Sequence, residues 1–145
     1  MDRRQLVKAT IAHQQTYRTP YCISFTPDGE QRLKDVWVHS CGNIQAIIPC
    51  LLEMGLDVLN PVQPEAMDLG TLKRDYGNQL TFWGGISTQR ALPFGSPGEV
   101  KAETRRVRDL MSQGGGYILA PAQDIQGDVP AENIMALIEA AKERR

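Results

Sequence analysis

His39 and Cys41 are the residues whose types and spacing are best suited to chemistry. They stand two positions apart directly after the apolar run 36–38, so on a continuing strand both side chains leave the same face. An imidazole and a thiolate placed in this way suit one zinc ion, and the spacing predicts such a site. A hydrogen-bonded pair without metal explains the same two residues equally well. Cys50 is not expected to join them, because it falls two helical turns beyond this loop.

Further polar and small residues follow the other apolar runs. Asn60 and Gln63 are expected either to hydrogen-bond a ligand or to cap the turn that they occupy. Gly84 and Gly85 would let a ligand approach the backbone closely, although a tight strand-to-loop turn is the simpler cause. Gln123 comes shortly after the last run. We therefore expect these five residues to form a substrate-binding set.

The elements that must position these residues alternate in type. Short apolar runs are followed by amphipathic segments, which predicts parallel strands joined by right-handed helical crossovers. In such sheets the carboxyl ends of all strands meet at one edge, where ligands gather. The predicted fold class is therefore α/β, with four consecutive βα units. The predicted strands are 36–38, 57–60, 80–83 and 117–120, and the predicted helices start at or near Asn43, Asp68, Ser96 and Pro130.

Local signals mark these helices. Ser96 and Glu99 form a capping box at the start of the third helix. Pro49 falls inside the first helical stripe and is expected to kink it. Trp37 and Trp83 are predicted core residues. The buried stripe of the first helix is expected to comprise Ile44, Ile47, Ile48, Leu51 and Leu52, and the solvated face of the third helix is expected to comprise Arg105, Arg106 and Arg108.

The first 35 residues form a different part of the chain. Asp2 is a plausible N-cap of a helix that runs to about His13, and a turn and a short helical piece at 30–34 follow. We predict an N-terminal helical arm over 1–35 and the four βα units over 36–145. Together they are expected to form a single domain, because the length and composition fit one core.

The composition excludes several classes of partner. A formal net charge of −1 and a pI of about 6.1 provide no basic field that would attract nucleic acid or an anionic membrane. No apolar stretch reaches the roughly 18 residues of a transmembrane helix, and the N-terminus lacks a signal-peptide core. The cysteines, 3 in number, are too few for a disulfide scaffold. We therefore expect a cytoplasmic protein without nucleic-acid or membrane partners.

A series of motifs, taken in order, is specific enough to carry a resemblance. It comprises His39–Asn43, Gly55–Pro61, Gln63–Glu65, Gly84–Ile86, Gly115–Pro121 and Pro130–Ile134. Together these motifs resemble the uroporphyrinogen decarboxylase family, which includes the decarboxylase itself and zinc- and corrinoid-dependent methyltransferases. The resemblance covers residues 36–145 almost continuously, and the opening, 1–34, is similar to the family's N-terminal arm.

The resemblance implies a TIM-barrel fold, which usually needs ~250 residues or more. This chain would supply only the arm and a half TIM-barrel-like unit. Four strands leave both sheet edges open to pairing with another chain. We therefore expect a homo-oligomer, a homodimer in which two sets of four strands complete one barrel or pack as facing half-barrels. The alternative is an internally deleted or fragmentary product with little activity.

The resemblance also implies a function, zinc-assisted methyl transfer that involves a corrinoid and a small methylated substrate or thiol, with a corrinoid protein as a partner. In the methyltransferase branch a third zinc ligand, Cys or His, comes from the end of the last strand, where this chain has Gln123. A neutral amide is a poor zinc ligand. Zinc affinity is therefore expected to be low unless Asp124, Glu65 or a partner chain contributes.

Two other functions are also considered. The catalytic aspartate and the arginine-rich motif of the family's decarboxylases lie early in the barrel and have no counterpart here. Uroporphyrinogen decarboxylation in porphyrin biosynthesis is therefore disfavoured. A non-catalytic or ligand-binding half-barrel remnant is the main alternative to the methyltransferase, and the sequence identifies no catalytic residue that decides between them.

Overall fold

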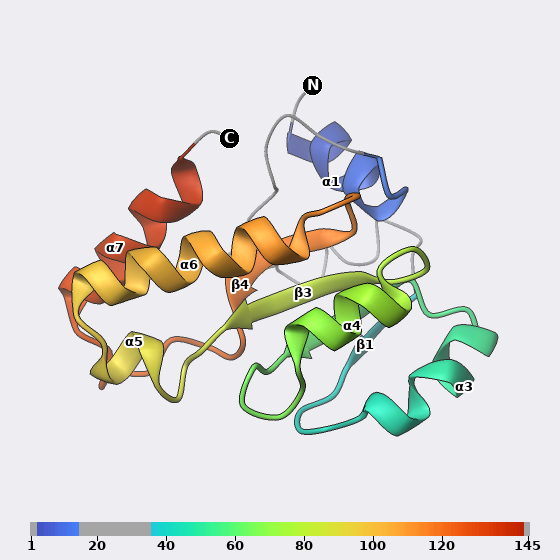
Figure 1. Cartoon of the computed structure of the whole chain (residues 1–145), viewed down its shortest axis with the longest axis horizontal. Helices are drawn as coiled ribbons and strands as arrows, with labels where there is room; N and C mark the ends of the chain where they lie inside the picture. The colour runs from blue at the N-terminus through green and yellow to red at the C-terminus, as the bar shows by residue number, and fades with distance from the viewer. Residues whose placement is uncertain (1–2, 15–35, 144–145) are drawn as a thin grey trace.

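The four predicted strands are present and form one parallel sheet (Figure 1). The computed structural model describes residues 3–14 and 36–143. The strands are β1 (Trp37–His39), β2 (Val58–Val62), β3 (Thr81–Ile86) and β4 (Tyr117–Pro121), paired in the order β1-β2-β3-β4. Each strand is followed by a helical segment, so the α/β class and the four consecutive βα units are confirmed. Sequential strands paired in parallel have the connectivity of a half TIM barrel.

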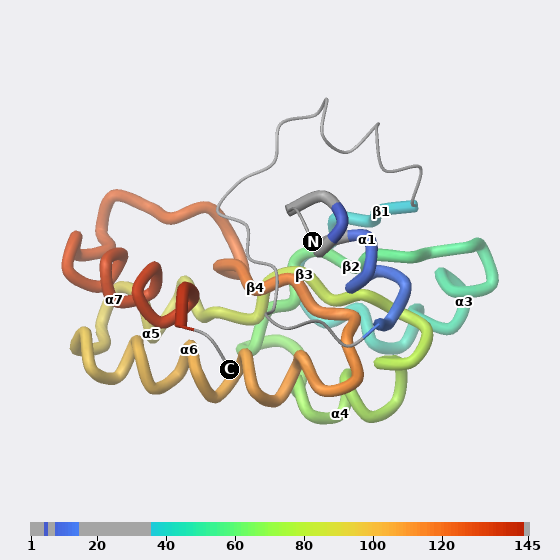
Figure 2. Tube along the Cα trace, turned by 90° about the horizontal axis from the view of Figure 1, so that it is seen from above, coloured from blue at the N-terminus to red at the C-terminus, as the bar shows by residue number. Residues whose placement is uncertain are grey.

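The crossover helices α4 and α6 cover one face of this sheet. The helical segments are α1 (Arg3–Ile11), the 3₁₀ turn η1 (Gln45–Ile47), α3 (Ile48–Glu53), α4 (Leu69–Tyr76), α5 (Ala91–Phe94), α6 (Pro97–Met111) and α7 (Ala131–Lys142). α4 and α6 lie in front of the strands in Figure 1, and Figure 2 again shows both on one side of the strands. The short α5 has no counterpart among the predicted helices.

The first crossover differs from the kinked helix that was expected. The N-cap residue is Ile44 rather than the predicted Asn43, whose side-chain oxygen nevertheless accepts a hydrogen bond from the Gln45 N–H at 3.1 Å. The chain then forms η1 and starts a separate helix, α3, so that Pro49 lies in the first helical turn. A proline is tolerated there, since an N–H at that position has no partner within the helix. The prediction that Ile47 belongs to the buried stripe is wrong, because the side chain is 50% exposed.

The start signals of α4 and α6 are confirmed. Glu99 accepts a hydrogen bond from the Ser96 N–H at 2.7 Å, and Ser96 Oγ accepts one from the Glu99 N–H, which completes the capping box. Asp68 caps α4 by accepting from the Thr71 N–H at 2.7 Å. These backbone hydrogen bonds lower the pKa of both carboxyl groups, because they favour the charged form.

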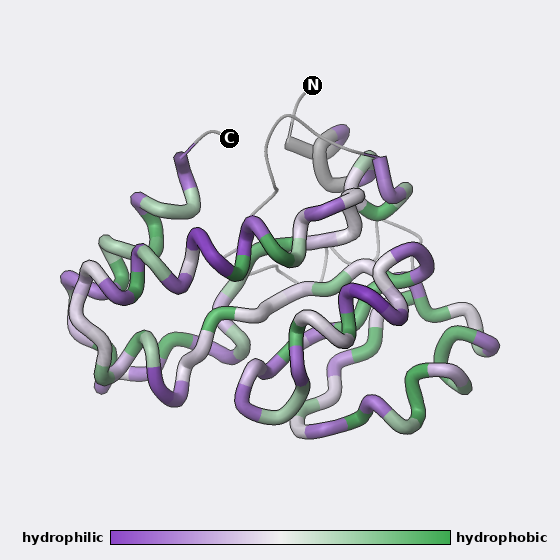
Figure 3. The backbone as a smooth tube through the Cα atoms, viewed as in Figure 1, coloured by the Kyte–Doolittle hydropathy of each residue, from purple (hydrophilic) through white to green (hydrophobic). Residues whose placement is uncertain are grey.

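The hydrophobic core lies between the sheet and its helices. Phe82 and Leu59 from neighbouring strands are fully buried in one cluster with Met111 of α6. Long hydrophilic stretches colour α4 and α6 in Figure 3, as expected of helices with one solvated side. Trp83 follows Phe82 in the strand and so faces the other side of the sheet. There it meets Trp37 edge to face, with ring centroids 5.1 Å apart, and both rings are partly buried rather than part of the core.

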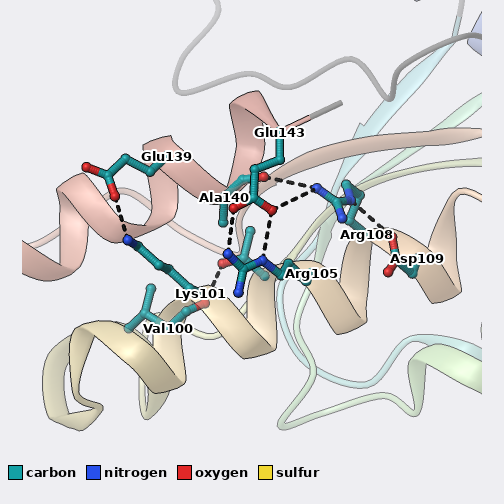
Figure 4. A network of polar contacts seen from close by, with 9 residues as sticks. Val100, Lys101, Arg105, Arg108, Asp109, Glu139, Ala140 and Glu143 are labelled. Carbon is teal, nitrogen blue, oxygen red and sulfur yellow. Dashed lines mark hydrogen bonds and ion pairs between the residues drawn. The ribbon is translucent and has the colours of Figure 1, made fainter. Parts of the chain in front are cut away.

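Arg108 contradicts the prediction of a solvated α6 face. It is only 8% exposed, and its Nη1 donates to the Ala140 carbonyl at 3.0 Å (Figure 4). Ala140 lies in the last turn of α7, where carbonyl groups lack helical partners, so the guanidinium satisfies that helix end. Arg105 is exposed as predicted, and its Nε contacts Glu143 at 2.8 Å. This side of α6 is therefore a packing surface for α7.

The amino ends of β3 and β4 are the place where α1 docks. The Gly116 N–H donates to the Thr10 carbonyl of α1 at 3.1 Å, and Lys73 of α4 donates to the Gly115 carbonyl at 2.6 Å. The glycine segment before β4 thus connects the arm, α4 and the sheet. Burial lowers the pKa of Lys73 from 10.5 to about 8, because the charged form is poorly solvated there.

The N-terminal arm is described only in part. α1 falls within the helix predicted over 2–13, whereas the turn and the helical piece at 30–34 lie outside the described residues. Within residues 3–14 and 36–143, no helix combines the length and apolar character that crossing a membrane requires.

The Gly84→Ala substitution is expected to destabilise the sheet. Gly84 has a φ of +127°, and a Cβ there would lie 2.8 Å from the Val62 backbone nitrogen. The free energy of unfolding should fall by about 2 kcal/mol, measured by urea titration. Gly98→Ala is the matched control, because a Cβ there meets nothing within 4 Å and alanine favours the helix. An equal loss in both variants would contradict the close approach of β3 to β2.

The pH dependence of stability should carry the signature of Lys73. Its pKa is about 8 in the folded chain and 10.5 for an ordinary solvated lysine, so between these limits the unfolded chain binds more protons. The free energy of unfolding should therefore rise with pH across this window. We expect the rise to be smaller in Lys73→Met, compared with the unchanged chain by urea titration at several pH values. Identical slopes would show that Lys73 is not buried at this interface.

Candidate functional site

His39 and Cys41 lie at the carboxyl end of β1, as the sheet geometry predicts. His39 ends the strand and Cys41 follows it by two positions, and both are exposed. The register pairs His39 with Asn60 of β2, and the Ser40 N–H donates to the Asn60 carbonyl at 2.8 Å. The turn that carries Cys41 is therefore attached to β2.

Asn60 orients the His39 imidazole. Its side-chain oxygen lies 2.6 Å from His39 Nδ1. Because an amide oxygen can only accept, Nδ1 carries the proton and Nε2 keeps its lone pair. That lone pair faces the Cys41 sulfur, with Nε2 and Sγ 3.8 Å apart. The side chain predicted to bind substrate is thus a neighbour of the imidazole, and its contact with a substrate stays a prediction.

Gln63 holds the next part of the same turn. Its Oε1 accepts a hydrogen bond from the Gly42 N–H at 2.6 Å, and Gln63 is 8% exposed. Asn60 in β2 and Gln63 directly after it therefore hold the end of β1 and the turn that follows. These side chains support that turn rather than the turn beside Pro61 that was the predicted alternative, and a ligand contact stays a prediction.

Gln123 contacts the Cys41 sulfur from the loop after β4, the strand at the far side of the sheet from β1. It follows β4, and its Nε2 donates to Cys41 Sγ at 2.7 Å across a sequence separation of 82 residues. The loops after the first and the last strand thus meet at one point. The residue at the position of the expected third zinc ligand is thus in direct contact with Cys41.

The donor set fits part of a catalytic zinc site. Zinc bonds of about 2.0–2.1 Å to nitrogen and 2.3 Å to sulfur, at a tetrahedral angle, place the two ligand atoms about 3.6 Å apart. The separation of 3.8 Å between His39 Nε2 and Cys41 Sγ agrees with this. A catalytic site takes three protein ligands, and the third neighbour here presents an amide N–H donor. Among the described residues, no group of three or more His, Cys, Asp and Glu side chains gathers, so these residues alone do not complete the site.

Glu65, one of the predicted substitute ligands, lies elsewhere in the described part of the chain. Glu65 accepts a hydrogen bond from the Ser87 hydroxyl, and both residues line an open groove of about 700 Å³ together with Arg90 and Phe94. None of the five predicted site residues lines this groove. Ser87 was not predicted, although its place directly after β3 is the signal that would have marked it.

Gly84 and Gly85 approach protein rather than open space. The Gly84 carbonyl accepts from the Tyr117 hydroxyl at 2.7 Å, and a Cβ on Gly85 would lie 2.9 Å from the same hydroxyl. Tyr117 is completely buried, and burial raises the pKa of its phenol far above the ordinary value, so it remains a neutral donor. The glycines make room for this contact. A role in binding a ligand stays a prediction.

The chain matches known proteins over most of its length. A family described as uroporphyrinogen decarboxylase (URO-D) matches residues 10–144. Two curated proteins from Methanosarcina barkeri, one of them from strain Fusaro, are both named methylcobamide:CoM methyltransferase MtaA. They are 31% and 29% identical to this chain over 106 residues, which is 73% of this chain and 30% of either relative.

A solved structure shares the fold. A methyltransferase from Methanosarcina mazei superposes with a TM-score of 0.60 at 24% sequence identity. The match covers 81% of this chain and 37% of that protein. The chain therefore spans about a third of the length of the relatives that it matches.

Replacing Asn60 with alanine should release the His39 ring. Without the oxygen at 2.6 Å, Nδ1 loses its acceptor, and we expect the imidazole to shift toward the tautomer with its proton on Nε2. Nitrogen chemical shifts from NMR measure this directly, because the chain has only 2 histidines. Asn43→Ala is the control, since the Asn43 side chain bonds to the Gln45 N–H without touching His39. An unchanged tautomer in Asn60→Ala would show that the ring is held by other contacts.

Proposed function

Because this chain belongs to the uroporphyrinogen decarboxylase family, we propose that it takes part in methyl transfer between a corrinoid and a small methylated substrate or thiol. Two relatives are named as methyltransferases that act between methylcobamide and CoM. The observation that carries the proposal is the meeting of His39, Cys41 and Gln123 at the carboxyl edge of the sheet. This is the edge at which folds of this type place their chemistry.

In the proposed reaction His39 and Gln123 act on the sulfur of a substrate thiol. A substrate thiol that enters beside Cys41 gives its proton to His39 Nε2, which Asn60 keeps available. Gln123 is placed to donate a hydrogen bond to a sulfur atom at this position. The thiolate forms the new sulfur–methyl bond, while the methyl–corrinoid bond breaks and leaves its electron pair on the corrinoid. The corrinoid is a substrate here, delivered free or by a partner protein.

Zinc has two proposed ligands in this chain, His39 and Cys41. When bound at such a site, zinc supplies charge that favours a thiolate over a thiol. The described residues of one chain do not provide a third ligand, so no step is assigned to the metal. A third ligand would have to come from outside the described residues.

The chain is also proposed to associate with another copy of itself. Among the described residues, β1 and β4 are the two ends of the sheet. Large apolar side chains near β1 and α3 are exposed, and Figure 3 colours much of η1 and α3 as hydrophobic. Unpaired parallel edges and exposed apolar groups favour association. The residues concerned are Val36 (49% exposed), Ile47 (50%) and Met54 (78%).

A ligand-binding or non-catalytic role is the second candidate. The amide at position 123 favours it, because the residue in contact with Cys41 is a hydrogen-bond donor rather than a base or a metal ligand. In that case the site would bind a small molecule without transferring a methyl group. The same experiment distinguishes the two candidates.

Methyl transfer from methylcobalamin to CoM, followed by the absorbance of the corrinoid, tests the proposed function. We expect turnover by the full chain, with and without added zinc, and a fall in rate of about two orders of magnitude in His39→Ala, which removes the group that takes the thiol proton. Asn43→Ala is the matched control, because the Asn43 side chain bonds to the Gln45 N–H and has no role in the proposed step. Binding of methylcobalamin without turnover would favour the ligand-binding role instead. Sedimentation at micromolar concentration checks the dimer, and a compact monomer would remove it.

A further inference from the structure

We infer that Gln123 sets the metal affinity of this site, and that it leaves the unchanged chain with a weak, two-ligand zinc site. The inference rests on the proposed function, because it concerns the same sulfur, and it adds how that sulfur is held. Gln123 Nε2 lies 2.7 Å from Cys41 Sγ, so position 123 is within reach of any ion bound to that sulfur.

The first step is the chemistry of the amide. An N–H group carries no lone pair for a metal, and it points its proton at the sulfur. An ion bound between Cys41 and His39 would meet this donor and would have to displace it. The amide oxygen that could turn inward is neutral, and thiolate, imidazole or carboxylate are the protein groups that zinc prefers.

The second step is that the side chains around the turn after β1 already pair with one another. His39 Nδ1 pairs with Asn60 at 2.6 Å, and the Gly42 N–H pairs with Gln63 at 2.6 Å. Gln123 pairs with the sulfur from the far loop. The turn after β1 and the loop after β4 are therefore held together by Gln123 itself, in the place where a bridging ion would otherwise connect them.

The third step is the reach of the side chain at position 123. Glutamate has the same length and shape as glutamine, and it replaces the donor with a carboxylate, which is an accepted zinc ligand. Histidine places a ring nitrogen at a similar distance from the backbone. Either residue would add the third ligand next to His39 and Cys41. A single side chain thus separates a hydrogen-bonded sulfur site from a three-ligand metal site.

Zinc titration of the full chain against a chromophoric chelator tests this inference. We expect Gln123→Glu and Gln123→His to bind one zinc ion per chain, at least about 100-fold more tightly than the unchanged protein. The scale follows because losing even an outer partner of a zinc ligand costs roughly 10–100-fold in affinity. Cobalt(II) should give intense tetrahedral visible bands in these variants and weak bands in the unchanged chain. Circular dichroism confirms that each variant is folded, and histidine serves where glutamate fails to fold.

Gln126→Glu is the matched control. Gln126 is exposed on the same loop, and its amide bonds to the Asp124 carbonyl at 3.3 Å, so this change adds the same charge away from the sulfur. The control should bind zinc as weakly as the unchanged chain. Tight zinc binding by the unchanged chain, as from a ligand of a second copy, would overturn the inference. Equal affinity in Gln123→Glu and Gln126→Glu would do the same, and so would no gain in either Gln123 variant. All of these readings are independent of the methyl-transfer assay, so the inference and the proposed function can fail separately.

Discussion

The register between β1 and β2 is the constraint on which the site depends. β1 has only three residues, and pairing of Trp37 with Val58, Val38 with Leu59 and His39 with Asn60 fixes all of them. Side chains alternate between the faces of a strand, so a slip of one residue would turn His39 to the other face and separate it from Asn60. A short strand contributes few ladder hydrogen bonds of its own. The side chains of Asn60 and Gln63 add contacts to the turn that follows and make this register more specific.

The parallel sheet then brings residues that are far apart in the sequence into contact. Every strand ends at the same edge, and for this reason Gln123 after β4 can touch Cys41 after β1. The amino ends of the strands differ in composition and in role. There the Gly115–Gly116 segment receives a hydrogen bond from Lys73 and pairs with Thr10, which binds the arm to the sheet. Folds of this class are expected to place stabilising contacts at the amino ends of the strands and chemistry at their carboxyl ends.

Patterns in the sequence predicted where helices and strands form better than they predicted how these elements pack against one another. The four apolar runs and the capping box of Ser96 and Glu99 are local signals, and the structure contains both. Arg108 was misplaced because its burial depends on Ala140, 32 positions away, and helical periodicity carries no information about which helix will pack there. Ile47 was misplaced because a 3₁₀ turn broke the periodicity on which its prediction rested. The short helix α5 offered too few residues for a periodic signal.

At the candidate site, the sequence indicated which residues lie near one another but not how they contact each other. The rule that parallel strands end together was enough to group His39, Cys41 and the polar residues after the other strands. It could not show that Asn60 faces an imidazole, since that depends on the register of two strands. Nor could it place Glu65, which stands two residues from Gln63 and yet pairs with Ser87 beside a separate groove.

The contacts of Gln123 explain why a departure at one position need not disorder the edge of the sheet. Without a third metal ligand, the Cys41 sulfur and the His39 imidazole would ordinarily face one another, and no contact would hold the loop after β4 in place. Here the amide supplies that contact, because it donates to the sulfur from a backbone position beyond β4. The imidazole is already fixed from behind by Asn60. A polar cluster whose donors and acceptors are paired is rigid without an ion. The ends of the strands therefore determine the shape of the site, and the side chain of Gln123, which contacts Cys41, determines its chemistry.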